Sequence, residues 1–152
     1  MRISLAFLCL STFFVNSALA CSAQDIIVSD AVISKPLKGK NSISSFMTIR
    51  NKCAEDLKLL AVEAPFKNIT ELHDMKHEGG IMKMYKVDSI DIAANSVVHL
   101  KRGGMHVMFM KLEGTIDTSE PVNLKVKFDK DLEVETTAIF KEMKGGDHHK
   151  KH

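Results

Sequence analysis

Three stretches decide the fold of this chain: ELHDM (residues 71–75), GGIMKMY (residues 79–85) and GGMHVMFMKL (residues 103–112). Each contains a short run with β-prone character, and two of them begin with a glycine pair, which marks a turn. In a β-strand, successive side chains point to opposite faces of the sheet. The pattern therefore predicts short strands, in one of which His106 and Met108 point to the same side.

Further runs of this kind continue on both sides of this region. They alternate about every ten residues with segments that break periodicity, which is typical of a β-sandwich. The strands that we expect lie at residues 25–34, 42–51, 57–64, 70–75, 81–87, 97–101, 106–112, 122–128 and 132–140, with a bulge or turn at Ser29-Asp30, a turn at 77–80 and a connection at 88–95. No segment has helical periodicity long enough for a βαβ unit. The sequence therefore predicts an all-β fold, an antiparallel Greek-key β-sandwich.

The segment at residues 57–64, LKLLAVEA, could also form a short helix by propensity. Pro65 closes the segment after eight residues, and its neighbours in sequence are strand-like. We therefore expect a strand here.

Residues 1–20 have the features of a secretory signal peptide, with Arg2 before an apolar run and small residues at Ala18 and Ala20. The apolar run is shorter than the roughly 20 residues that span a bilayer. We therefore expect export and cleavage before Cys21, with no membrane insertion afterwards. Residues 21–140 then form a single domain, since domains typically hold about 100 to 150 residues.

Two cysteines remain after cleavage, Cys21 and Cys53. In an oxidising compartment they are expected to form one disulfide. Lipid anchoring is the less favoured alternative for Cys21, because residues 18–20 match the leucine-led lipoprotein box poorly. A free thiol at Cys53 remains open as well.

The C-terminal segment, residues 141–152, has no apolar pattern and is expected to be a disordered tail. It contains four side chains that can bind metal: Met143, His148, His149 and His152. Two interpretations remain open, a native metal-binding tail or a solvated basic end.

Composition excludes several classes of function. Loss of the signal peptide removes only Arg2, which leaves 20 basic against 19 acidic residues. The chain has no long basic block and few aromatic residues, which argues against nucleic-acid binding. It has no G-x-S-x-G nucleophile motif and no H-E-x-x-H zinc motif. We therefore expect a protein that is not an enzyme.

The histidines and methionines of residues 71–112 form a candidate soft-metal site. Thioether sulfur is a soft ligand, so a set of thioethers and imidazoles without a carboxylate prefers Cu(I). A single strand methionine is more often flexible core filler than a ligand. The clustering favours a site made of His73, Met84, His106 and Met108, with Met75, Met82 and Met110 as further shell residues or alternative ligands.

The spacing within this set is specific. Ten residues separate His73 from Met84, 21 separate Met84 from His106, and one separates His106 from Met108. Together with ELHDM, GGIMKMY and GGMHVMFMKL, this spacing resembles the signature of the PCuAC family of periplasmic copper chaperones. The resemblance extends over about residues 25–140 of the chain.

The resemblance implies a cupredoxin-like β-sandwich whose four matching residues bind one Cu(I) near the surface. It also implies delivery of copper to the copper centre of a cytochrome oxidase or to its assembly factors. Some relatives have a Met- and His-rich C-terminal extension that can bind Cu(II). The tail of this chain resembles it, which implies that Met143, His148, His149 and His152 are possible Cu(II) ligands. Arg102 and Val32 depart from the family pattern, where proline and tryptophan are common, and both lie outside the matching ligand positions.

Two other functions remain open. A blue-copper electron-transfer protein has a related fold, but its site needs a thiolate beside two histidines, and neither cysteine is near His106 in the sequence. An exported β-sandwich that binds another protein without metal would use its methionines as core. For each of these functions we expect a periplasmic protein, and for the copper carrier a monomer.

Overall fold

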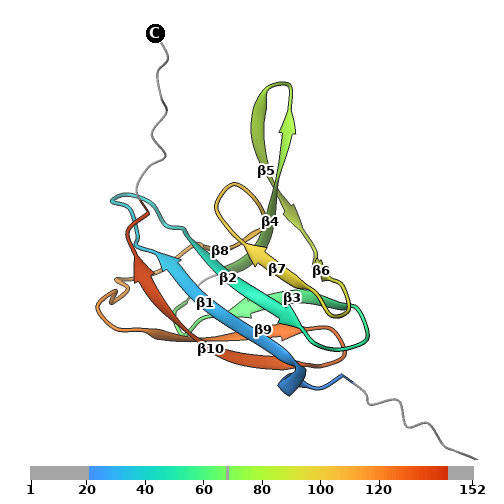
Figure 1. Ribbon diagram of the computed structural model, residues 1–152. Helices are drawn as coiled ribbons and strands as arrows, with labels where there is room; N and C mark the ends of the chain where they lie inside the picture. The colour runs from blue at the N-terminus through green and yellow to red at the C-terminus, as the bar shows by residue number, and fades with distance from the viewer. Residues whose placement is uncertain (1–20, 68, 144–152) are drawn as a thin grey trace, which may run out of the picture.

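The computed structural model describes residues 21–67 and 69–143 (Figure 1). Within these residues the helical structure is limited to one short 3₁₀ turn, and no helix is long and apolar enough to cross a bilayer. The elements are η1 (Ala23–Asp25), β1 (Ile26–Ser34), β2 (Ile43–Asn51), β3 (Leu57–Glu63), β4 (Ile69–Glu78), β5 (Ile81–Val87), β6 (Ile90–Ile92), β7 (Val97–Leu100), β8 (His106–Met110), β9 (Val122–Phe128) and β10 (Glu133–Lys141). The predicted all-β class is confirmed.

The strands form one continuous open sheet in the order β5-β4-β8-β2-β1-β10-β9-β3-β6, with β7 also paired to β2. Its two halves supply one hydrophobic core, in which Ile49 and Phe109 from one half and Leu59 and Val126 from the other are fully buried. This is the sandwich that the alternating sequence predicts, with one apolar face on each half.

One pair departs from the predicted antiparallel arrangement. β1 and β10 pair in parallel, with Ile33 opposite Phe140. Parallel neighbours cannot be joined by a tight hairpin. β1 and β10 are the first and last strands, so the whole domain serves as their connection, and local sequence patterns could not reveal the pair.

A β-bulge interrupts β1 at the predicted place. The register against β2 shifts between Ser29 and Val32, and Asp30 has a φ of 53°. The extra residue moves the inward positions from even to odd numbers, so that Ile26 and Ile33 are both buried. A strand without the bulge would turn one of these two side chains to the outer face.

Two strands end more than one residue from the predicted position, and one short strand was not predicted. The turn expected at 77–80 contains only Gly79 and Gly80, whose φ values of 60° and 81° suit a two-residue hairpin turn. β4 therefore continues to Glu78. The short strand β6 lies inside the connection expected at 88–95, and β8 ends at Met110, before Lys111 with its φ of 52°.

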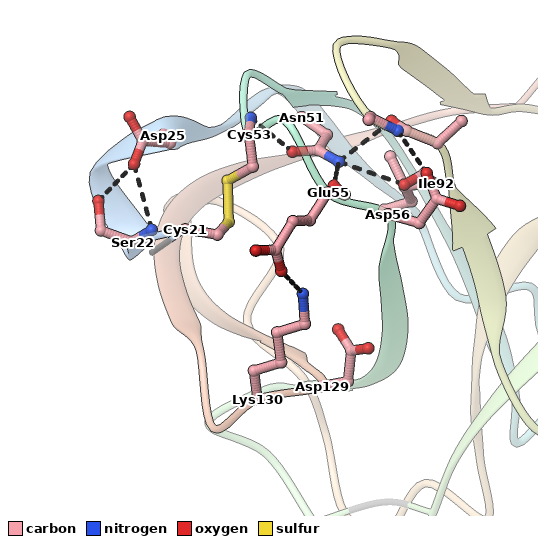
Figure 2. Close-up of a disulfide and its surroundings, with 12 residues drawn as sticks. Cys21, Ser22, Asp25, Asn51, Cys53, Glu55, Asp56, Ile92, Asp129 and Lys130 are labelled. Atoms are coloured by element: carbon pink, nitrogen blue, oxygen red, sulfur yellow. Dashed lines mark hydrogen bonds and ion pairs between the residues drawn. A yellow bond between two sulfur atoms is a disulfide. The ribbon is translucent and has the colours of Figure 1, made fainter. Parts of the chain in front are cut away.

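A buried asparagine and a disulfide hold the segment after β2 (Figure 2). Asn51 is 1% exposed, and its Nδ2 donates to the carbonyl oxygens of Glu55, Ile92 and Ala93 while its Oδ1 accepts from the Cys53 amide. The disulfide joins Cys53 to Cys21. This segment is therefore tied both to β6 and to the N-terminal turn η1.

Candidate metal centre

The candidate site lies on the outer face of the half-sheet formed by β4, β8 and β2. His73 on β4 and His106 on β8 are directly opposite each other in the antiparallel ladder. Their sequence neighbours Leu72 and Val107 point into the core, 3% and 0% exposed. Because side chains alternate along a strand, both histidines point away from the core and toward the same side of the sheet.

The two imidazole rings are close and nearly perpendicular. Their centroids are 5.7 Å apart, with an interplanar angle of 84° between His73 and His106. Each histidine is only 6% exposed although it lies on the outer face. The ring of Phe46 on β2 lies on the other side of His106, at a centroid distance of 6.1 Å. The pair is therefore shielded from water.

His73 has one ring nitrogen without a partner. Its Nε2 lies 2.8 Å from the Oε2 of Glu71, and a carboxylate can only accept, so Nε2 carries the proton. The remaining nitrogen, Nδ1, is buried and has no hydrogen-bond partner. A buried lone pair of this kind costs free energy unless something binds it. This nitrogen is available to a metal ion.

His106 has the opposite tautomer. Its Nδ1 donates to the carbonyl oxygen of Gly104 at 2.8 Å, which leaves the lone pair of the neutral ring on Nε2. This Nε2 lies 3.2 Å from the Sδ of Met84, so two lone-pair donors face each other with no proton between them. A soft cation bound by both atoms would satisfy this geometry.

The two methionines of the candidate set differ in exposure. Met84 on β5 is 51% exposed, whereas Met108 on β8 is 9% exposed. Met108 points to the same face as His106, and its Sδ accepts a hydrogen bond from the Ser44 hydroxyl at 3.0 Å. The structure thus brings His73, His106 and Met84 together and places Met108 beside them.

The other predicted residues lie at different distances from this group. Met75 pairs with Met84 across the β4–β5 ladder, and Met82 lies nearer the hairpin tip, opposite His77. Met110 is at the end of β8, opposite Ile69. In the tail, Met143 lines a cavity together with Met108, while His148, His149 and His152 lie outside the described residues.

Electrostatic contacts hold Glu71 against His73. The hydrogen bond from His73 lowers the pKa of the Glu71 carboxyl, and Lys86, whose Nζ lies 3.3 Å from Glu71 Oε1, lowers it further. The ionised carboxylate in turn fixes the ring orientation of His73. A carboxylate that accepts from the far nitrogen of a ligating histidine raises the basicity of the ligand.

Sequence reasoning missed the groups that orient the ligands. Glu71 was detectable, because residues 71 and 73 share one face of a strand and carboxylate–histidine pairs are common beside metals. The Gly104 carbonyl and the Ser44 hydroxyl were not detectable, since they depend on loop conformation and on the β2–β8 register.

The candidate site does not suit metal ions that prefer carboxylate or thiolate ligands. Among the described residues, no three histidine, cysteine, aspartate or glutamate side chains converge as a possible site. Cys21 and Cys53, the cysteines of the described residues, form the disulfide that follows the end of β2, whereas Met108 pairs with Ser44 near the start of that strand. The donors present are imidazole nitrogen and thioether sulfur, which suit a soft ion.

Solved structures of PCuAC domains have the same fold as this chain. The copper-bound PCuAC domain from PmoF2 is 18% identical, with a TM-score of 0.65 over 82% of this chain and 97% of that domain. The solution structure of CuI-DR1885 from Deinococcus radiodurans is 25% identical, with a TM-score of 0.64 over 86% of this chain and 85% of that protein. The cupredoxin-like β-sandwich is thereby confirmed.

Comparison of the sequence with models of protein families identifies the family of this chain. A search of curated protein sequences finds no match to the chain. The family model that matches is described as lipoprotein LpqE-like, and it covers residues 26–139, from the first residue of β1 nearly to the end of β10. The chain therefore belongs to the LpqE-like family.

Proposed function

We propose that this protein is an exported Cu(I)-binding metallochaperone and not an enzyme. The observation that carries the proposal is the pair of opposed, shielded histidines: His73 has an unpartnered Nδ1, and His106 directs its free Nε2 at the sulfur of Met84. The proposal is supported by PCuAC domains of the same fold, two of which are described as copper-bound or CuI forms.

Copper is the cargo of this protein, and the ligands would be His73 Nδ1, His106 Nε2 and the sulfurs of Met84 and Met108. Met108 would exchange its hydrogen bond from Ser44 for the ion. All four ligands are neutral, and the soft thioethers favour Cu(I) over Cu(II). One tightly bound ion per domain follows from one such group.

The exposure of Met84 supports transfer to a partner. This ligand is 51% exposed and lies on β5, the edge strand, whereas both histidines are shielded. An incoming ligand from an acceptor can replace the exposed thioether first, without unfolding the carrier. We infer a monomer that hands Cu(I) to the copper centre of a cytochrome oxidase or to an assembly factor. The lipoprotein-like family is compatible with export, and we place the protein in the periplasm.

The test is a competitive Cu(I) titration of the full chain under reducing, anaerobic conditions. We expect the double variant Met84→Leu, His106→Ala to lose tight binding of one ion. The matched control is Met47→Leu, His99→Ala. It changes a core methionine and a histidine that is hydrogen-bonded to Thr48, and it should keep the Cu(I) affinity of the parent.

The proposal fails if the Met84→Leu, His106→Ala variant binds its tightest ion as strongly as the parent does. Unchanged spectra of the parent on addition of Cu(I) would instead favour an interaction module without metal. An intense visible charge-transfer band in the Cu(II) form would favour a blue-copper protein, although both cysteines are in the disulfide.

A further inference from the structure

The outer half of the β4–β5 hairpin projects beyond the sandwich (Figure 1). The β8 ladder on β4 reaches only as far as His73, so Asp74–Glu78 pair with β5 alone. Residues 81–86 of β5 are all exposed. Core packing therefore does not explain which side chains occupy this part of the hairpin.

The side chains of this hairpin are sorted by chemistry between its two faces. One face holds Asp74, Lys76 and Glu78 with their partners Ile81, Lys83 and Tyr85, and Glu78 contacts both lysines, at 3.7 Å and 3.0 Å. The other face continues from His73 through two further rungs, Met75 opposite Met84 and His77 opposite Met82. The imidazole and thioether groups of this part of the hairpin are thus gathered on one face.

On the face that continues from His73, the outermost pair consists of two side chains that can bind metal and that lie close together. The Nδ1 of His77 lies 3.4 Å from the Sδ of Met82. Met82 is 46% exposed, so it is not the flexible core filler that strand methionines usually are. An exposed thioether beside an imidazole, with two more thioethers on the next rung, has the ligand types that select Cu(I) or another soft monovalent ion.

We propose that His77 and Met82 form a second, weaker soft-metal site at the hairpin tip, with Met75 as a further ligand. Four residues of extended strand place it about 13 Å from His73, with Met75 and Met84 about midway. Because this site has fewer donors and is open to water, it binds less tightly than the shielded centre. Copper passes through this site on its way to and from the shielded centre. This relay role, unlike the binding itself, rests on the proposed function.

The test uses silver(I), a soft ion with the same charge as Cu(I) and no redox chemistry under these conditions. The full chain is labelled with ¹³C at the methionine methyl groups, and the signals of Met75, Met82, Met84 and Met108 are assigned from single leucine variants. We expect the first equivalent to shift Met84 and Met108, and a second, weaker equivalent to shift Met82 and Met75. Residue-resolved signals separate this second ion from any ion bound by the C-terminal histidines.

Two variants complete the experiment. His77→Phe with Met82→Leu should abolish the second shift of Met75 and leave the first equivalent unchanged. The matched control, Lys76→Gln with Lys83→Gln, changes the same two strands on the opposite face and should keep both shifts. The inference is overturned if Met82 does not shift with two equivalents, or if Met75 in the His77→Phe, Met82→Leu variant still shifts at the parent concentration. Failure of Met84 and Met108 to shift, with Met82 shifting, would count against the proposed function alone.

Discussion

At the residue scale, neighbouring groups decide which nitrogen each histidine offers. The Glu71 carboxylate accepts a hydrogen bond from Nε2 of His73, and the Gly104 carbonyl accepts one from Nδ1 of His106. The two rings, which face each other across one ladder, therefore present different nitrogens. The nitrogens that would bind the proposed ion are preorganised, so binding would not have to reorient either ring.

Removal of the Glu71 carboxylate should weaken metal binding without removing a ligand. We expect Glu71→Ala to lower Cu(I) affinity about 10- to 100-fold, the usual cost of losing a group that orients a ligating histidine. Glu71→Gln should have a smaller effect, because the amide oxygen can still accept from Nε2. A competition titration measures both variants.

The control for this prediction is Glu63→Gln. The pKa of Glu63 is also lowered, by its hydrogen bond from Lys127, but this carboxylate lies on β3 in the other half of the sheet. Its substitution should leave Cu(I) affinity unchanged. An Ala variant at Glu71 with the parent affinity would show that the His73 ring is oriented by packing alone.

Loss of the Asn51 side chain should cost more stability than loss of an exposed asparagine. It is buried, and all of its side-chain hydrogen bonds go to backbone groups of neighbouring segments. Asn51→Ala removes the side-chain partner of the Glu55 carbonyl and of the Cys53 amide, and it should reduce the free energy of unfolding by about 2 to 4 kcal/mol. Urea denaturation measures the change.

A matched surface variant is Asn123→Ala. Asn123 accepts one hydrogen bond from Thr137 at an exposed position, so its loss should cost about 1 kcal/mol or less. Equal losses for the two asparagines would contradict the structural role given to Asn51.

At the element scale, a short turn fixes the start of the sandwich. η1 precedes β1, and Ser22 donates to Asp25 Oδ2 from its hydroxyl at 2.6 Å and from its amide at 3.1 Å. These bonds to the ionised form lower the pKa of Asp25, the hydroxyl most strongly. The turn places Cys21 against Cys53 and directs β1 along β2.

Ser22→Ala should therefore raise the pKa of Asp25 toward its ordinary value of 3.8. In the parent, the folded-state pKa lies below the unfolded one, so this contact contributes fully above about pH 4 and is lost as the pH falls through the lowered value. An NMR titration of the Asp25 side-chain carboxyl carbon measures the shift. Asp117, whose pKa is lowered by Ser119, is the internal control and should not change.

At the scale of the whole molecule, stabilising links and the candidate centre lie in different places. The first and last strands pair in parallel, and the disulfide spans 32 residues of sequence to join η1 to the end of β2. The histidines lie on β4 and β8, and β8 pairs with the first residues of β2, where Ser44 contacts Met108. Stability and metal binding should therefore respond separately to mutation.

Loss of the disulfide provides the test of this separation. Cys21→Ser with Cys53→Ser should lower the free energy of unfolding by about 3 to 4 kcal/mol, the loop-closure value for a crosslink of this span. The Cu(I) affinity of the folded variant should equal that of the parent. Thermal unfolding and a titration well below the transition measure the two quantities. A large loss of affinity in the folded variant would mean that the disulfide supports the centre as well.

Much of the fold was predictable from local pattern. Glycine pairs and alternating side chains located the strands to within a few residues, and Ser29-Asp30 marked the bulge in β1. The missed features, β6 and the longer β4, depend on pairing partners, because three residues or a turn boundary carry little signal of their own. The parallel β1–β10 pair depends on both ends of the chain at once.

The sequence by itself determined the all-β class, the positions of Cys21 and Cys53, and the spacing of His73, Met84, His106 and Met108. Only the tertiary structure decided that His73 and His106 face each other, that Glu71 and Gly104 select their free nitrogens, and that His77 joins Met82 at the hairpin tip. Residue types and alternation are local properties of a chain. Register between strands that are distant in sequence is set by burial of the whole core, so it exists only once the sandwich has folded.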